Sequence, residues 1–231
     1  MKTPHALRAG AVIVAALACL VAMASPASAT THTYNVGMES GRISVGTINF
    51  DTPGSGATGC PASTGTGITG TINDVTNVIT GTLTITSLFA LPWPFTGNYA
   101  LIATGSGTGT WNNATGTFSS LTINPVAYTI RNVVVTGTGT TTVCTVGTTV
   151  VCSGTASLHA SGGLYNGATL PLSTSEKIYV NATGTILTRN TPCNFPFSAI
   201  ITVGTSLTLA DNPNDDVAPA GTDPGAIFHQ A

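Results

Sequence analysis

Acidic residues and histidines are the side chains of this sequence most able to perform acid–base chemistry, and both are scarce. Glycoside hydrolysis needs two carboxylates that flank the scissile bond, and ester hydrolysis commonly uses a Ser-His-Asp site. No G-x-S-x-G nucleophile motif occurs, and we interpret His32, His159 and His229 as surface or hydrogen-bonded interior residues. The acidic residues also fit structural roles, because several of them stand beside turn-forming residues. The residues that a hydrolase could use are Glu39, Asp51, Asp74, Glu176 and His159.

Two further motifs have ligand-binding residue types without the context that binding requires. The run "GTGITG" at 65–70 matches G-x-G-x-x-G, but a run rich in β-branched residues follows where a phosphate-binding helix would begin. Asp211, Asp215 and Asp216 offer oxygen ligands for calcium, but the run lacks the glycine and terminal glutamate of an EF-hand loop. We therefore predict no cofactor and no bound metal.

Aromatic residues make up 6% of the chain and gather in two proline-containing segments, "LFALPWPF" at 88–95 and "TPCNFPF" at 191–197. Proline restricts the backbone, so rings between prolines are presented to a partner at a reduced entropic cost. The rings could stack on a glycan or contact a protein surface, or the phenylalanines could instead cap one end of the core. The predicted binding residues are Trp93, Phe95, Tyr99 and Phe195.

The N-terminus has the pattern of a cleaved secretory signal peptide over residues 1–29. Lys2 and Arg8 precede an apolar run at 9–23, and Ala27-Ser28-Ala29 forms a small-residue cleavage site. Lipid attachment at Cys19 is an alternative that its preceding residues fit poorly. No later segment is apolar for the length of a membrane-spanning helix. We expect a secreted protein, either extracellular or retained at the cell envelope.

Four cysteines follow the predicted cleavage site, which in an exported protein indicates two disulfides. Sequence alone allows three pairings. We favour Cys144–Cys152, because "CTVGTTVVC" could form a hairpin about Thr148, and this choice leaves Cys60–Cys193. Zinc is disfavoured because paired C-x-x-C motifs are missing.

The charge balance excludes one class of partner. The chain has 6 Lys and Arg residues and 8 Asp and Glu residues, and two of the six basic residues fall in the predicted signal peptide. So few cations cannot form the basic surface that neutralises phosphates. We therefore predict that the protein does not bind nucleic acid.

Strand patterns dominate the rest of the chain, as in "GTLTITSL", where Leu83 and Ile85 alternate with threonines. The predicted strands are 41–50, 78–89, 116–123, 126–135, 141–152, 154–160, 176–187 and 197–210. No segment has a convincing helical stripe. The pattern predicts one all-β domain over 30–210, an antiparallel β-sandwich or jelly roll, with a closed barrel as the alternative. Residues 211–231, acidic and proline-rich, are expected to form an irregular tail docked through Ile227 and Phe228.

Together these features favour a secreted or envelope-associated, non-enzymatic binding or structural protein. Its expected partner is a surface protein or a glycan that contacts the Trp93 loop, and self-association is a further option for a chain so poor in charge. The alternatives are a secreted hydrolase, glycan- or ester-directed, and a channel-forming β-barrel of an outer envelope.

Overall fold

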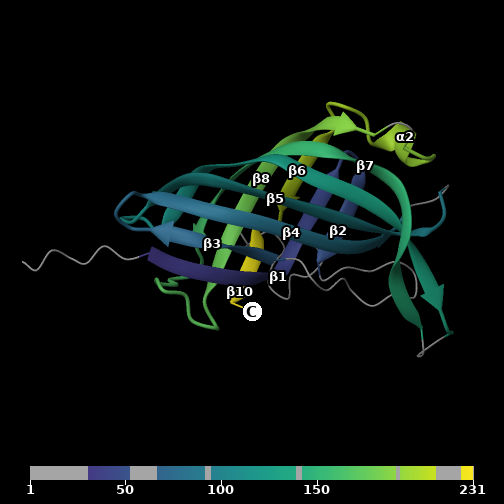
Figure 1. Ribbon diagram of the computed structural model, residues 1–231. Coiled ribbons are helices and arrows are strands. Elements are labelled where there is room, and N and C mark those ends of the chain that lie inside the picture. The colour runs from purple at the N-terminus through teal and green to yellow at the C-terminus, as the bar shows by residue number, and fades with distance from the viewer. Residues whose placement is uncertain are drawn as a thin grey trace, which may run out of the picture. The chain divides into compact units, whose positions relative to one another are not determined.

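The computed structural model describes residues 31–52, 67–91, 95–138, 142–190, 193–211 and 225–230, which form ten strands and one short helix (Figure 1). The helix is α2 (Phe197–Ile200). The strands are β1 (Thr31–Val45), β2 (Ile48–Thr52), β3 (Gly67–Asn73), β4 (Val78–Ala90), β5 (Asn98–Asn112), β6 (Thr117–Thr136), β7 (Val143–Leu164), β8 (Lys177–Arg189), β9 (Ser206–Ala210) and β10 (Ala226–Gln230). The prediction of an all-β protein is confirmed.

The strands pair in one antiparallel sheet that closes on itself. From β3 to β8 each strand pairs with the next along the chain, and β1 pairs with β3. The gap between β8 and β1 is filled by two short strands: β10 pairs with Lys177–Val180 of β8, and β9 pairs with Ala182–Thr185. Both short strands also pair with β1. The antiparallel pairing is confirmed, whereas the division into two sheets of a sandwich or jelly roll is not confirmed.

Two strands, β6 with 20 residues and β7 with 22, are longer than the short strands that the sequence predicted. Segments 116–123 and 126–135 were expected to be separate strands, but both belong to the 20-residue strand β6. The pairing of β6 with β7 shifts register between Ile123 and Val126, where an irregularity replaces the expected turn. Such bulges bend and twist a strand, which allows one long strand to follow a curved sheet.

The interior of the closed sheet is filled by apolar side chains. On β4, Ile79, Leu83, Ile85 and Phe89 are buried, while Thr82 and Thr84 are exposed, as the alternation in the sequence predicted. Between these side chains remains an apolar void of about 30 Å³. Ligand pockets for small molecules usually measure some hundreds of cubic ångströms, so this void is far too small to bind one.

Tyrosine rings cross the sheet over glycines at two equivalent places. Tyr34 on β1 is paired with Gly70 on β3, and its hydroxyl donates a hydrogen bond to the carbonyl of Thr80. A Cβ at Gly70 would lie 2.6 Å from the Tyr34 hydroxyl oxygen and 2.0 Å from that carbonyl oxygen, so the position requires glycine. Burial raises the pKa of Tyr34 well above its usual range, so the phenol stays neutral. Tyr128, Gly154 and Thr188 repeat the arrangement on β6, β7 and β8.

The C-terminal segment from residue 197 onward departs from the predicted elements. Residues 197–210, expected as one strand, contain α2, a turn at 203–204 and the strand β9. Within the predicted irregular tail, β10 is a regular strand, and its Ile227 and Phe228 are buried. No helix in the described part of the chain is long and apolar enough to cross a membrane.

Candidate functional site

The closed sheet has two ends, which we name by their main features. The turn end carries the β3–β4 turn at 74–77, the β5–β6 turn at 113–116 and the β7–β8 loop at 165–176. The disulfide end carries residues 95–97, the segment 193–205 with α2, and a ribbon that we define as residues 133–136 of β6 and 143–150 of β7.

The cysteine pairing differs from the prediction. Cys152 is bonded to Cys193, and their Cα atoms lie 4.4 Å apart. Cys144 and Cys152 cannot pair because both lie on the continuous strand β7, where eight residues at about 3.3 Å each separate them by roughly 26 Å. Cys144 is also disulfide-bonded, and Cys60 lies outside the described residues.

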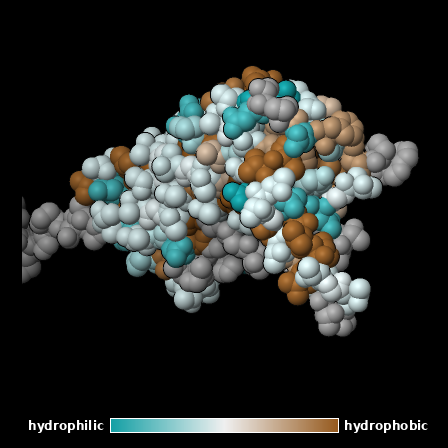
Figure 2. Space-filling view, turned by 45° about the vertical axis from the view of Figure 1, so that its right-hand side comes forward, coloured by the Kyte–Doolittle hydropathy of each residue, from teal (hydrophilic) through white to brown (hydrophobic). Residues whose placement is uncertain are grey.

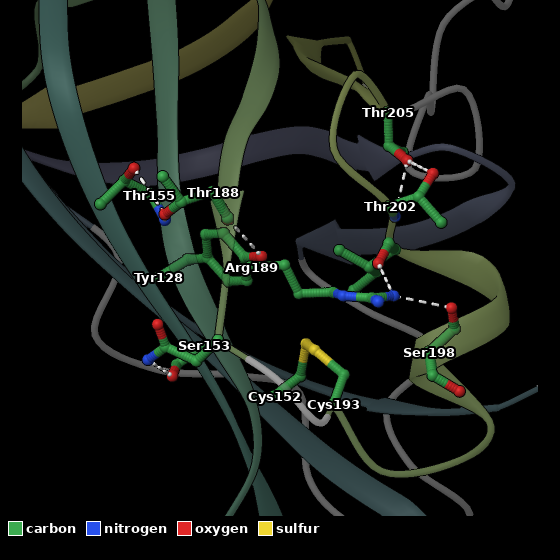
Figure 3. The surroundings of a disulfide bond; sticks show 12 residues. Tyr128, Cys152, Ser153, Thr155, Thr188, Arg189, Cys193, Ser198, Thr202 and Thr205 are labelled. Carbon is green, nitrogen blue, oxygen red and sulfur yellow. Dashed lines mark hydrogen bonds between the residues drawn. A yellow bond between two sulfur atoms is a disulfide. The ribbon is translucent and has the colours of Figure 1, made fainter.

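An arginine reinforces the segment that the Cys152–Cys193 bond attaches to the sheet (Figure 3). The Arg189 guanidinium at the end of β8 donates hydrogen bonds to the carbonyls of Ser198, at 2.7 Å, and Ile201, at 3.1 Å. These carbonyls belong to the α2 segment and its first following residue. The side chain therefore satisfies backbone groups that the short helix leaves unpaired.

Two groups of aromatic rings lie at the disulfide end. Phe197 is fully buried and packs edge-on against Tyr99, with ring centres 4.9 Å apart, and against Phe89, at 6.2 Å. Phe95 packs against Phe195 at 5.3 Å, and Phe195 is 74% exposed. Of the four predicted binding residues, Phe95 and Tyr99 are both half-buried and pack against the core, Phe195 is exposed, and Trp93 lies outside the described residues.

The ribbon adds exposed aliphatic side chains to this end. β5 pairs with β6 no further than Asn132, and β8 pairs with β7 only from Gly154, so the two ribbon segments pair with each other alone among the described strands. A hydrogen bond from the Asn194 amide to the Val151 carbonyl joins the Phe195 segment to the base of the ribbon. Figure 2 shows hydrophobic residues gathered on this side of the molecule. The exposed valines are Val134, Val135, Val143, Val146 and Val150.

The turn end contains an acid–base pair that the sequence analysis did not bring together. His32 Nε2 lies 2.8 Å from Asp74 Oδ2, and the two side chains are 16% and 28% exposed. The β1–β3 register pairs Thr31 with Asn73, so His32 lies beside the turn that carries Asp74. The two residues are 42 positions apart, and only the strand register reveals that they meet.

These residues line a cleft of about 580 Å³ between the turns. Trp111, near the end of β5, also lines it, and hydrogen bonds from Trp111 N to the Asn77 carbonyl and from Leu164 N to the Gly116 carbonyl hold the turns in place. The other lining residues are Asn113, Thr115, Gly116, Leu164, Gly167, Ala168, Thr169 and Leu170.

One residue that lines this cleft has a buried polar group without a partner within the described part of the protein. Trp111 is only 2% exposed, and its indole N–H is buried without an acceptor. A buried donor that makes no hydrogen bond is costly, so native proteins usually satisfy such groups with protein, water or a ligand. Trp111 was not singled out from the sequence, because an isolated tryptophan at a strand end has no distinguishing pattern.

Glu176 and His159, the other hydrolase candidates whose side chains the structure describes, have hydrogen-bond partners other than Asp74. Glu176 caps the 165–176 loop by accepting hydrogen bonds from the Ser173 and Thr169 amides at 2.6 and 3.0 Å, and these bonds lower the pKa of its carboxyl. His159 is exposed on β7 and contacts Thr122. The side chains of Glu39 and Asp51 lie outside those that the structure describes.

The structure gives no support for a metal centre within its described ranges. Those residues contain no group of three or more His, Cys, Asp or Glu side chains that could hold an ion. Most of the acidic run considered for calcium, including Asp215 and Asp216, lies outside those ranges.

Comparison with known proteins identified no relative: no family model, no curated protein and no solved structure matches the chain.

Proposed function

We propose that this protein is an exported, non-enzymatic binding protein that contacts a partner protein through the exposed apolar surface of its disulfide end. We define this surface as Phe95, Phe195 and the five exposed valines of the ribbon. The observation that carries the proposal is the exposure of the Phe195 ring, 74%, while it packs against Phe95.

The surroundings of Phe195 support a role in contact. Its segment is attached to the sheet by Cys193, two positions before it, and by the amide of Asn194. An attached segment loses little conformational freedom on binding, and exposed aromatic rings are frequent sources of binding energy at interfaces.

The ribbon supports a protein partner over a glycan. Residues 132–151 include no charged residue and no proline, the two devices that commonly protect an exposed strand edge from pairing. Branched alkyl groups beside a strand edge fit the apolar groups and backbone of another protein, whereas sugar binding calls for polar groups around the rings.

Two observations favour binding over the alternative functions. The apolar side chains that fill the interior favour action at the outer surface, because a channel needs a polar, water-filled lumen. Among the side chains that the structure describes, Glu176 and His159 have hydrogen-bond partners other than Asp74, so no convergent set of hydrolase groups supports that alternative there.

The test is photo-crosslinking in the cell that exports the protein. Phe195 is replaced by the photo-reactive p-benzoylphenylalanine, and Val75, 60% exposed in the β3–β4 turn of the opposite end, receives the same replacement as a matched control. We expect a discrete covalent adduct from position 195 and none from position 75, with mass spectrometry identifying the partner. No adduct at position 195, or equal adducts at both positions, would overturn the proposal.

A further inference from the structure

We propose that Asn166 is a modification site, at which water converts the side-chain amide to a carboxylate by spontaneous deamidation. Asn166 and Gly167 form the only Asn-Gly dipeptide of the sequence, and they lie in the β7–β8 loop at the turn end. The inference is independent of the proposed partner surface, because that surface lies at the opposite end of the closed sheet.

The reaction requires water and no other reactant. The backbone nitrogen of Gly167 attacks the side-chain Cγ of Asn166, the Cγ–Nδ2 bond breaks, and Nδ2 leaves as ammonia with the proton that the backbone amide gives up. Because the two groups belong to adjacent residues, this step is intramolecular and is favoured over direct hydrolysis. Water then opens the resulting succinimide ring at either carbonyl carbon by breaking its bond to the ring nitrogen, which yields aspartate or isoaspartate.

The residue after Asn166 leaves the attacking nitrogen accessible. Asn166 and Gly167 are both exposed. A Cβ placed on Gly167 would meet no atom within 4 Å, so the surroundings leave room for the ring to close. Glycine also has more backbone freedom than any other residue, which helps its nitrogen to approach Cγ.

The reacting groups are also free of hydrogen bonds within the described part of the chain. The turn at 165–168 is closed by a bond of 3.0 Å from the Ala168 amide to the Tyr165 carbonyl, which uses neither the Gly167 amide nor the Asn166 side chain. Both central residues have a positive φ, 50° at Asn166 and 80° at Gly167. The turn therefore leaves both reacting groups to the solvent.

Asn77 offers a matched comparison within the same protein. It is likewise exposed in a turn, β3–β4, and has a φ of 53°. The next residue, however, is Val78, whose branched side chain crowds its own backbone and restricts its motion. Val78 also begins β4, where it is paired with Asn73. We therefore expect ring closure at Asn77 to be much slower than at Asn166.

The modification would alter one wall of the cleft at the turn end, which residues 167–170 help to line. Isoaspartate lengthens the backbone by one methylene group inside the turn that the Ala168 amide closes, so that hydrogen bond loses its geometry. The new carboxylate would also lie beside a recess of about 200 Å³ that Asn166 shares with Glu176, the residue that caps the loop. Like charges at this recess repel, which further loosens the loop.

The test is peptide mass spectrometry of the purified full chain during incubation in mildly alkaline buffer made with heavy-oxygen water. Each conversion introduces one heavy oxygen and so marks the modified residue. We expect Asn166 to react at least about ten times faster than Asn77, and its rate to rise less than tenfold when urea unfolds the protein. Equal rates at the two residues, or an Asn166 rate that rises tenfold or more on unfolding, would overturn the proposal.

Asn166→Gln provides the control variant, because glutamine would have to form a larger ring and should not react in the same time. Hydrogen exchange at the Ala168 amide should be several-fold faster in aged wild-type protein than in fresh protein, and unchanged in aged Asn166→Gln protein. Unchanged exchange in a wild-type sample whose Asn166 has mostly reacted would overturn the effect on the cleft wall, as would an equal change in the variant.

Discussion

At the disulfide end, separate segments of the chain are joined by a covalent bond, by an arginine that donates to two carbonyls and by aromatic rings packed edge-on. The turn end relies instead on hydrogen bonds within and between short turns. Despite its stronger attachments, the disulfide end leaves large apolar groups in water. The turn end has a cleft of about 580 Å³, lined in part by Trp111, whose buried indole N–H has no partner among the described residues. The difference teaches that the two ends of one closed sheet can be stabilised in different ways, by attachments between separate segments at one end and by hydrogen-bonded turns at the other.

The largest effect should come from the aromatic cluster that supports the disulfide end. Phe197→Ala removes a fully buried ring that packs against Tyr99 and Phe89, and we expect a loss of about 3–5 kcal/mol in the free energy of unfolding. Leu170→Ala, a truncation of a partly buried side chain at the turn end, should cost less than half as much. Urea unfolding of both variants provides the measurement, and equal losses would mean that the two ends share one mode of stabilisation.

A smaller loss is expected when the covalent bond is removed. Replacing both Cys152 and Cys193 by alanine opens a loop with a sequence separation of 41, for which the chain-entropy argument gives at most about 4 kcal/mol. Hydrogen exchange should increase around α2 and at the base of the ribbon, with the β3–β4 and β5–β6 turns unchanged. Faster exchange at those turns as well would show that the bond stabilises the whole sheet and not one end.

The smallest effect should be a local response to pH at the turn end. The Ser173 and Thr169 amides lower the pKa of Glu176 below its ordinary value of 4.5. A carboxyl with a lowered pKa in the folded state contributes stability above its ordinary pKa, and the contribution is lost as the pH falls through the folded pKa. We expect amide exchange at Thr169 and Ser173, corrected for its intrinsic pH dependence, to increase on acidification.

Glu176→Gln provides the control for this response. The variant should show faster exchange at both amides already at neutral pH, and acidification should add little. A response to acid that persists in Glu176→Gln would assign the effect to another group.

Local sequence patterns predicted much of the fold. The alternation of apolar and polar residues over 78–89 correctly predicted a strand and its buried face. This was possible because side chains of an extended backbone point to opposite faces in turn. The strand β5 was missed, since its "TGSGTGT" run has no apolar alternation to detect. Residues 197–210 were predicted as a strand from their β-branched content, but tertiary contacts of Phe197 and Arg189 stabilise a helical turn at their start.

The candidate sites were predicted less completely. Proline and phenylalanine composition singled out Phe195, whose ring is exposed, and the same pattern included Phe95 and Tyr99, which are both half-buried against the core. The cleft could not be predicted, because His32 and Asp74 are ordinary residues until the β1–β3 register places them 2.8 Å apart.

The sequence by itself determined the kind of structure: extended strands from alternating residues, a scarcity of charged residues, and cysteines available for bonding. These properties depend on neighbouring residues or on composition, and no long-range contact is needed to read them. Only the tertiary structure decided that Cys152 pairs with Cys193, that the sheet closes on itself, and that Trp111 meets His32 and Asp74 at one cleft. The physical reason is that strand register and closure depend on the simultaneous packing of side chains from the whole interior, which no single segment contains.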